Sequence, residues 1–222
     1  MSWKGLGTWW VDELADDPSY DDVITPMLLD MLQPEPGLLY LDLGAGEGRV
    51  MRAVEAAGAG VVGLDLNEDL AGRAGASVVA DLPQIPFRED SVDGVYALLV
   101  LEHVEDHGGV FASAAKVTRE GGVFALVINH PYWSSPGSTP IQDEDGEDLW
   151  RPGAYFQPGY TDIPIRDQTV RFHHRSMGDL LNAAARAGWS LERLEEHAHH
   201  DRTASIDVPR LLACRWRLSR EG

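Results

Sequence analysis

The chain has 222 residues, of which 44% are hydrophobic and 24% charged, a composition typical of a folded globular protein. Aspartate and glutamate number 36 against 18 lysine and arginine, and the resulting formal charge of −18 disfavours binding to nucleic acid or to anionic membranes. Since no apolar run approaches the roughly 20 residues that span a bilayer and the N-terminus lacks a signal-peptide pattern, we expect a cytoplasmic protein.

An acidic and aromatic segment, residues 1–37, precedes the regular part of the sequence. Within it, the spacing of apolar residues predicts a helix from Asp21 to Leu32, which Pro34 and Pro36 end. We expect this segment to form an N-terminal cap rather than a part of the central sheet.

Apolar runs of strand length then alternate with helical stretches. Because nearly continuous apolar strands joined by helices form parallel sheets covered on both faces, this alternation predicts an α/β fold with a doubly wound sheet. We expect one domain over residues 1–222. Strands are predicted at Leu38–Leu43, Gly60–Asp65, Ser77–Ala80, Val92–Val100 and Val123–Ile128, and helices at Glu47–Ala57, Asn67–Arg73 and Val110–Thr118, with a break at Glu120–Gly122.

Residues 129–170 interrupt the alternation with several prolines and an acidic turn, Asp143–Asp148. A loop of this length in a compact domain is usually functional or disordered, and we predict an inserted cap loop. The regular pattern resumes with a helix at Ser176–Ala187, and Gly188 is expected to end that helix. Two extended segments follow, Trp189–His197 and Pro209–Leu218, which could pair as an antiparallel hairpin at one edge of the sheet.

A glycine-rich turn, Gly44-Ala45-Gly46-Glu47-Gly48, lies between the first strand and the first helix. Glycines allow positive φ and a close approach of the backbone to a ligand, and the start of the helix offers N–H donors, so the turn predicts a nucleotide-like ligand. A dinucleotide-binding fingerprint would need its third glycine at position 49, where this chain has Arg49. Asp65 ends the second strand about 20 residues downstream, where a ribose-binding carboxylate is expected.

These residues resemble the class I S-adenosylmethionine-dependent methyltransferases, in the type 11-like group that acts on small molecules. The run Leu41–Val50 is similar to the first motif of that family, Asp65 to its ribose-binding acid, and Asp81 with Leu82 to the residues that contact adenine. Ser91–Val104 resembles the fourth strand and the turn after it. The resemblance implies a Rossmann-like, seven-stranded, mostly parallel sheet with an antiparallel seventh strand, and S-adenosyl-L-methionine as cofactor.

The resemblance also implies which residues hold the cofactor. Asp42 would hold the methionine amino group, and the N-terminal cap would fold over the methionine end. Ala45 stands where many members have cysteine, but the contact there is mostly through the backbone. Carboxylates and aromatic rings together suit a sulfonium cation. The expected cofactor residues are Trp10, Tyr20, Asp42, Gly44, Ala45, Gly46, Asp65, Leu66, Asp81, Leu82 and Leu98.

Two histidines follow predicted strands at the sheet edge where doubly wound folds bind ligands. His103 follows the fourth strand and His130 the fifth, and because histidine titrates nearest neutrality each is a candidate catalytic base. A role in a turn explains either histidine equally well. We predict methyl transfer to oxygen or nitrogen of a small, partly apolar molecule, bound in an apolar site beneath the two cap segments.

Two other functions fit the same fold. One is an NAD(P)-dependent oxidoreductase with a dinucleotide in the same crevice, and the other is a non-catalytic ligand-binding or regulatory module. We expect no metal site, because the remaining histidines lack the spacing of metal ligands and the acidic turn lacks the calcium-loop pattern. The single cysteine, Cys214, is expected to be a buried, reduced thiol. The sequence specifies neither the acceptor nor the oligomeric state.

Overall fold

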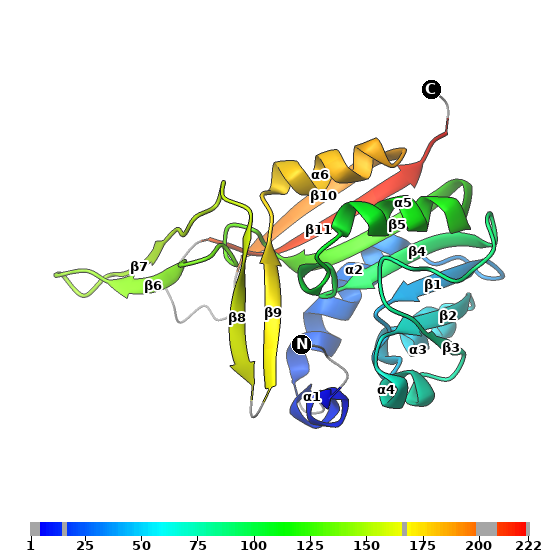
Figure 1. Cartoon of the computed structure of the whole chain (residues 1–222), viewed down its shortest axis with the longest axis horizontal. Coiled ribbons are helices and arrows are strands. Elements are labelled where there is room, and N and C mark those ends of the chain that lie inside the picture. Colours follow the sequence, from blue (N-terminus) through cyan, green and yellow to red (C-terminus); the bar gives the residue numbers. More distant parts are fainter. Residues whose placement is uncertain (1–4, 15–16, 166–167, 199–207, 221–222) are drawn as a thin grey trace.

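The computed structural model describes residues 5–14, 17–165, 168–198 and 208–220. At its centre is a seven-stranded sheet in the order β10-β11-β5-β4-β1-β2-β3 (Figure 1). The five strands from β1 to β5 are parallel, whereas β11 is antiparallel to both of its neighbours, β5 and β10. The predicted class is therefore confirmed, including the reversed strand. The strands are β1 (Leu39–Leu43), β2 (Gly60–Asp65), β3 (Ser77–Val79), β4 (Val92–Leu98), β5 (Thr118–Asn129), β10 (Trp189–Ala198) and β11 (Pro209–Leu218).

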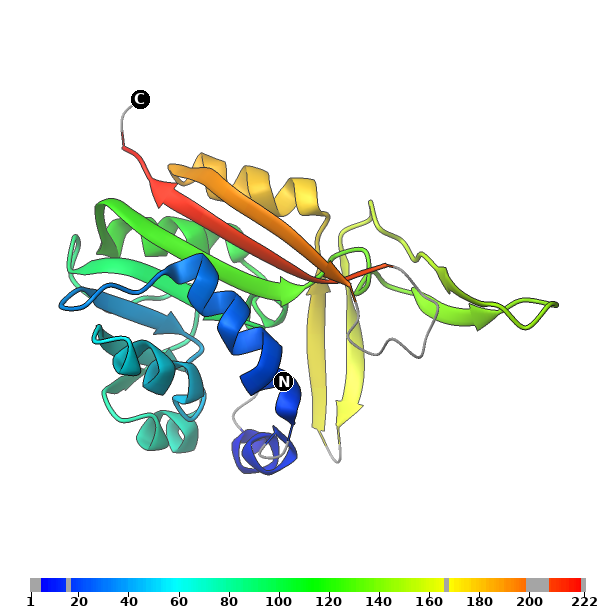
Figure 2. The ribbon, with the colours of Figure 1, turned by 180° about the vertical axis from the view of Figure 1, so that it is seen from behind.

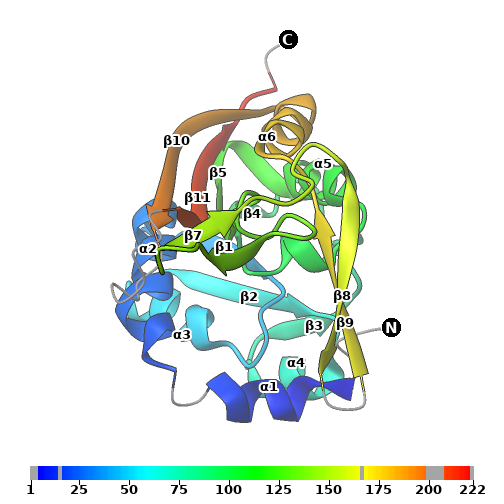
Figure 3. The ribbon, with the colours of Figure 1, turned by 90° about the vertical axis from the view of Figure 1, so that its left-hand side faces the viewer.

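Helices cover both faces of this sheet (Figure 3). On one face lie α2 (Thr25–Leu32) and α3 (Arg49–Ala56), and on the other lie α5 (His107–Val117) and α6 (Met177–Arg186). Such two-sided cover is what nearly continuous apolar strands require, because both faces of each strand must leave water. Within the described ranges, no helix combines the length and the apolarity needed to cross a membrane.

An aromatic cluster fills the core beneath α5 and α6. Phe111, Phe124, Trp189 and Trp216 meet mainly through tilted and edge-to-face contacts, with ring centroids 5.2 to 5.9 Å apart. The indole N–H of Trp189 donates to the Phe111 carbonyl oxygen at 3.0 Å, so its one polar group is satisfied inside the core. Cys214 is buried in the same layer, and burial raises the pKa of its thiol to about 12, in line with the expected inert thiol.

The N-terminal helix and the start of the fifth strand differ from their predicted bounds. The N-terminal helix consists of a π-helical turn, η2 (Tyr20–Ile24), followed directly by α2, whose end at Leu32 is as predicted. The helix before Glu120–Gly122 does end ahead of these residues, at Val117, but the strand that was predicted to begin at Val123 begins at Thr118 and runs through them. The strand bulges there instead: the pairing with β4 shifts between Val92 and Gly94, and Gly121 takes a φ of 74° that suits glycine.

The predicted cap loop at 129–170 is wrong in its secondary structure. It contains two hairpins, of which the first joins β6 (Thr139–Gln142) to β7 (Asp148–Arg151) and the second joins β8 (Gly159–Ile165) to β9 (Gln168–His174). Every strand of a two-stranded ribbon is an edge strand, so the prolines that suggested a loop are tolerated. Figures 1 and 2 show both hairpins projecting from the body of the molecule.

The second hairpin and the N-terminal segment meet at the carboxyl ends of the parallel strands. Figure 1 shows β8 and β9 standing across this edge, with the helix α1 (Gly7–Leu14) beside the lower ends of these two strands. Gly5 lies so close to Gln168 that a Cβ on Gly5 would be 2.9 Å from its side-chain amide nitrogen. The two segments expected to form caps therefore lie on the same side of the sheet.

Candidate cofactor-binding site

A pocket opens at the carboxyl ends of β1, β2 and β4, with about 1160 Å³ of space including its mouth. Its walls come from the glycine turn, from the ends of these strands and from the 3₁₀ turn η3 (Leu101–His103). Val11 of α1 also lines it, so the N-terminal segment does reach the pocket. All of the expected cofactor residues line this pocket except Trp10, whose side chain lies outside the described part of the structure.

The glycine turn is shaped by two different constraints. Gly44 has a φ of 82°, and a Cβ at this position would lie 2.4 Å from a methyl carbon of Val100, so the packing of the β4 end requires glycine. Gly46 has a φ of 56°, yet a Cβ there would meet no protein atom within 4 Å. The space in front of Gly46 is therefore open, and Gly46 lines the pocket.

Asp65, the last residue of β2, is hydrogen-bonded to the glycine turn. Its two carboxylate oxygens accept backbone N–H groups, Oδ2 from Gly46 and Oδ1 from Asn67, each at 2.8 Å. A carboxylate oxygen can accept more than one hydrogen bond, so both keep acceptor capacity for a ligand. Asp65 is 9% exposed, and burial raises its pKa although the backbone bonds oppose that shift. Asn67 then caps α4 (Glu68–Arg73), which fixes this side of the pocket.

Asp42 is the most deeply buried acid of the site. It lies on β1 with 3% of its surface exposed, and burial raises its pKa to about 8, against the smaller lowering effect of the Tyr96 hydroxyl. A carboxyl group with this pKa takes up or releases its proton near neutrality. A cationic group of a ligand placed beside Asp42 would favour the ionised form.

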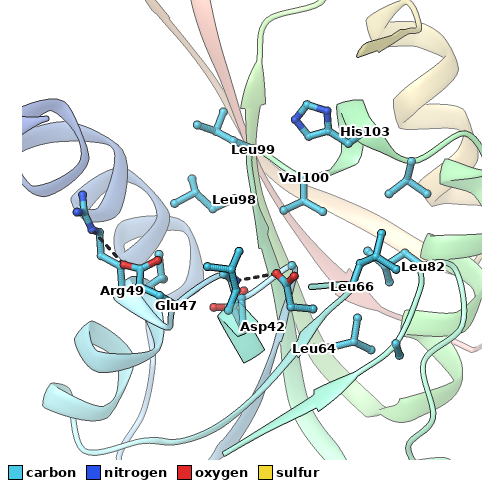
Figure 4. Close-up of a pocket in the computed structure, with 18 of the residues that line it drawn as sticks. Asp42, Glu47, Arg49, Leu64, Leu66, Leu82, Leu98, Leu99, Val100 and His103 are labelled. Atoms are coloured by element: carbon cyan, nitrogen blue, oxygen red, sulfur yellow. Dashed lines mark hydrogen bonds and ion pairs between the residues drawn. The ribbon is translucent and has the colours of Figure 1, made fainter. Parts of the chain in front are cut away.

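The pocket has two chemically different ends. Leu66 and Leu82 form apolar walls at one end, close to the exposed Asp81. Figure 4 shows Glu47 and Arg49 at the opposite end, across Asp42. The first end suits a flat heterocycle with an exocyclic amine, and the second suits charged groups.

His103 is the predicted catalytic residue that the structure brings to the pocket. Its Nδ1 lies 3.1 Å from the carbonyl oxygen of Arg171 on β9, and its ring makes an edge contact with Phe172 at 4.5 Å between centroids. Since a carbonyl oxygen only accepts, Nδ1 carries the hydrogen in this contact, and in the neutral ring Nε2 holds the lone pair. The second hairpin therefore orients His103 and selects its tautomer.

His130 is a correction to the sequence-based prediction. It is 3% exposed, is not among the residues that line the pocket, and has both ring nitrogens engaged inside the fold. Nδ1 accepts the backbone N–H of Tyr132 at 3.0 Å, and Nε2 lies 2.8 Å from a carboxylate oxygen of Glu196 on β10. Burial lowers its pKa, against the effect of Glu196. We therefore withdraw His130 as a candidate base.

Sequence reasoning missed several residues that line the pocket. Arg49 entered only as a departure from a glycine pattern, although its charge next to a ligand-binding turn was an available signal. Leu99 has a φ of 53°, a conformation that non-glycine residues rarely adopt and that often marks a functional position. Nothing in the local sequence distinguishes Leu99 from its apolar neighbours.

Comparisons with known proteins agree with this geometry. The sequence model of a family described as "Methyltransferase domain" matches residues 41–126. The crystal structure of an S-adenosylmethionine-dependent methyltransferase from Mesorhizobium loti superposes with a TM-score of 0.80 at 30% identity, covering 88% of this chain and 99% of that one. The chain belongs to the class I S-adenosylmethionine-dependent methyltransferases. Its cofactor is S-adenosylmethionine.

Curated relatives of this methyltransferase match over shorter segments. A ubiquinone biosynthesis O-methyltransferase from Aromatoleum aromaticum is 30% identical over 139 residues, which are 56% of this chain and 58% of that protein. A sterol 24-C-methyltransferase from Gibberella zeae is 34% identical over 105 residues, 41% of this chain and 28% of that protein. The match thus spans little more than half the length of the first and less than a third of the second.

The residues of the pocket fit S-adenosylmethionine. The open space at Gly46 lets the ligand approach the backbone, and Asp65 offers two acceptor oxygens for the ribose hydroxyls. Asp42 presents a buried carboxyl group to a cation. A pyrophosphate would instead meet four acidic side chains in this pocket, those of Asp42, Glu47, Asp65 and Asp81, which disfavours a dinucleotide.

Proposed function

We propose that the protein transfers a methyl group from S-adenosylmethionine to an oxygen or nitrogen atom of a small, partly apolar molecule. The observation that carries this proposal is the character of the pocket wall beyond the cofactor residues. Leu99, Val100 and Val104 line it together with His103, the one histidine that lines the pocket among the described residues. The relatives named for sterol and ubiquinone chemistry support an acceptor with apolar character.

Methyl transfer demands alignment and the exclusion of water more than it demands reactive side chains. When bound, the cofactor would supply a methyl group on a positively charged sulfur: a lone pair of the acceptor would bond to the methyl carbon in line as the carbon–sulfur bond breaks, and S-adenosylhomocysteine would leave. In this chain Asp65 and the Gly46 turn would hold the adenosine part, and Val11 of α1 would cover the pocket. The β8–β9 hairpin would close the acceptor side, since Arg171 on it contacts His103.

His103 is our proposed base for an O–H acceptor. Its Nε2 would accept the acceptor's proton while Nδ1 continues to donate to the Arg171 carbonyl oxygen, so the ring keeps its orientation when it becomes positively charged.

The first test is ligand-dependent stability. Because a ligand that binds only the native state stabilises it by about 2.7 kcal/mol at 100 times its Kd, S-adenosylhomocysteine should raise the melting temperature clearly. NAD and NADP at equal concentrations should leave the melting temperature unchanged. Stabilisation by NAD but not by S-adenosylhomocysteine would instead support an oxidoreductase.

Activity is then tested with tritiated S-adenosylmethionine and a panel of phenols, catechols, hydroxyquinones and amines. Transfer to oxygen or nitrogen of any member supports the proposal. Strong S-adenosylhomocysteine binding without transfer to any member would favour a non-catalytic ligand-binding module.

His103→Gln should lower kcat for an O–H acceptor by about 100-fold, since a positioned base contributes roughly 10² to 10⁴. The Kd for S-adenosylhomocysteine should change little, because the cofactor is held by other residues. The matched control is His173→Gln on β9, which changes a histidine that does not line the pocket and should leave kcat unchanged. An unaltered kcat for His103→Gln would show that the acceptor needs no base from this position.

A further inference from the structure

We infer that Arg175 is a positioning residue for His103. Its guanidinium group fastens the turn η3 to the end of β9 and so holds the imidazole against the Arg171 carbonyl oxygen. The inference rests on the proposed role of His103 as base and adds to it the residue that keeps this base in place. It is carried by hydrogen bonds between two segments that lie 70 to 74 residues apart in the sequence.

One side chain, that of Arg175, joins the second hairpin to η3. It follows β9 directly and precedes Ser176, the N-cap of α6. Its Nη1 donates to the Leu101 carbonyl oxygen at 2.9 Å, and its Nη2 donates to that of Glu105 at 2.8 Å. The Val104 carbonyl oxygen also accepts from Nη2. Three carbonyl groups, one in η3 and two in the chain that leaves it, thus converge on one guanidinium group.

The turn needs a donor from outside. It spans only Leu101–His103, and a 3₁₀ turn of this length satisfies few of its own backbone groups. The Val104 N–H donates to the Leu101 carbonyl oxygen at 3.2 Å, the long end of the hydrogen-bond range. A guanidinium carries five N–H donors in a rigid planar fork. One arginine can therefore bind several carbonyl groups at once and fix their relative positions.

The hydrogen bonds of the Arg175 side chain serve this contact. In the part of the chain that the structure describes, all of them go to the three carbonyl groups named above. Burial lowers the pKa of Arg175 to about 10, and Glu102, Asp106 and Glu105 oppose that shift through their charges. Because a cation withdrawn from water is costly unless its partners are well placed, Arg175 and η3 fix each other.

The same strand also holds the ring of His103. His103 ends η3, so the carbonyl groups bound by Arg175 lie on both sides of it in the sequence. Its Nδ1 lies 3.1 Å from the Arg171 carbonyl oxygen, and its ring centroid lies 4.5 Å from that of Phe172. Figure 4 shows His103 at the pocket wall next to Val100. The end of β9 therefore fixes the ring of the candidate base, and Arg175 fixes its backbone.

The first test is a double-mutant cycle on kcat for an O–H acceptor. Arg175→Gln should lower kcat by about 10-fold, because a base displaced from the acceptor removes its proton poorly. The Kd for S-adenosylhomocysteine should change by less than about twofold, since Arg175 does not line the pocket. In a His103→Gln background, Arg175→Gln should cause no further loss, because the imidazole through which it acts is absent. Arg175→Lys, which keeps the charge but loses the fork, should recover part of kcat.

The second test observes the His103 ring directly and needs no substrate. Nitrogen-15 spectra of histidine-labelled protein distinguish the two tautomers of a neutral ring, and the His103 signals are identified by their loss in His103→Gln. At about pH 8.5, where an ordinary histidine is neutral, the wild-type protein should show the Nδ1–H form that the contact with Arg171 requires. Arg175→Gln should shift this ring toward the Nε2–H form. The control is Arg186→Gln, which changes an exposed arginine of α6 and should alter neither kcat nor the spectrum.

Two results would overturn the inference while leaving methyl transfer intact. One is a loss of kcat by Arg175→Gln that is equally large with and without His103, and the other is a His103 tautomer that stays the same. Circular dichroism and the melting temperature establish that each variant is folded, and Arg175→Lys carries both tests if Arg175→Gln does not fold. If His103→Gln kept full kcat, or if no acceptor were methylated, the proposed base or the proposed function would fail instead. The histidine spectra would then decide the positioning role by themselves, a shifted tautomer supporting it and an unshifted one overturning it.

Discussion

Asp65→Ala is expected to weaken S-adenosylhomocysteine binding by more than about 100-fold, because hydrogen bonds to a charged group contribute roughly 1.5 to 3 kcal/mol each and two ribose hydroxyls would lose theirs. The same change removes the acceptor of the Gly46 and Asn67 backbone N–H groups. We therefore expect an additional loss of about 1 to 3 kcal/mol in the free energy of unfolding. Calorimetric titration gives the first quantity and urea denaturation the second.

Two variants separate these effects. Asp65→Asn keeps the shape of the side chain and one good acceptor oxygen, so it should recover much of the stability but little of the affinity. Asp69→Ala removes an exposed acid from the first turn of the neighbouring helix α4 and should leave the Kd unchanged within about twofold. If Asp65→Ala bound S-adenosylhomocysteine as tightly as the wild-type protein, the assignment of the ribose site to β2 would be wrong.

The central sheet could be predicted because its sequence signals are local. Each strand from β1 to β5 is built on a largely apolar run between turn residues, and β2 begins at Gly60 and ends at Asp65 as predicted. The short helix after it also follows from local chemistry, since Asn67 accepts the N–H groups of Asp69 and Leu70 and so starts α4. Where a backbone needs one particular residue type, as at Gly44, the sequence carries that requirement directly.

The two hairpins of the insertion could not be predicted in the same way. Prolines lie in β6 and β8, and several large apolar side chains of the hairpins, such as Ile141 and Ile163, are exposed. Neither the hydrophobic period nor the composition of these segments therefore indicates a strand. The second hairpin is fixed by distant contacts instead. Arg175, at the end of β9, donates to the carbonyl oxygens of Leu101 and Glu105. Such contacts are set by the tertiary structure and leave no local pattern.

For the two candidate bases, too, the local sequence does not predict everything: it does not give the direction of a single side chain. A position after a parallel strand predicts which edge of the sheet a residue reaches, and this holds for both His103 and His130. It does not predict the direction in which the side chain points. The backbone N–H of His130 donates to the carbonyl oxygen of Arg210 on β11, and the His130 ring contacts Glu196 on β10 and does not line the pocket. The position of His130 therefore depends on β10 and β11, two strands that lie far from it in the sequence.

Asp42→Asn should make the protein more stable at pH 8 and less able to bind its cofactor. The pKa of Asp42 is raised from an ordinary 3.8 to about 8 in the folded protein by burial. Between these two values the folded state keeps a proton that the unfolded chain has released, so the free energy of unfolding falls as the pH rises. One such group contributes a slope of up to about 1.4 kcal/mol per pH unit. An asparagine at position 42 does not titrate and adds no such pH dependence. The difference in the free energy of unfolding between Asp42→Asn and the wild-type protein should therefore grow from pH 5 to pH 8 and then level off.

Urea denaturation of both proteins at pH 5, 6, 7, 8 and 9 measures this difference, with Asp69→Asn as the exposed control that should follow the wild-type protein throughout. The affinity for the cofactor should fall in Asp42→Asn, whereas the stability should rise. The cofactor ammonium favours an ionised carboxylate, so Asp42→Asn should weaken S-adenosylhomocysteine by roughly 10-fold or more, the scale of a charged hydrogen bond. A stability difference between wild type and Asp42→Asn that is the same at pH 5 and pH 9 would contradict the raised pKa. Gained stability with unchanged affinity would instead show that the ammonium group is held by other residues, and that burial of Asp42 serves the fold alone.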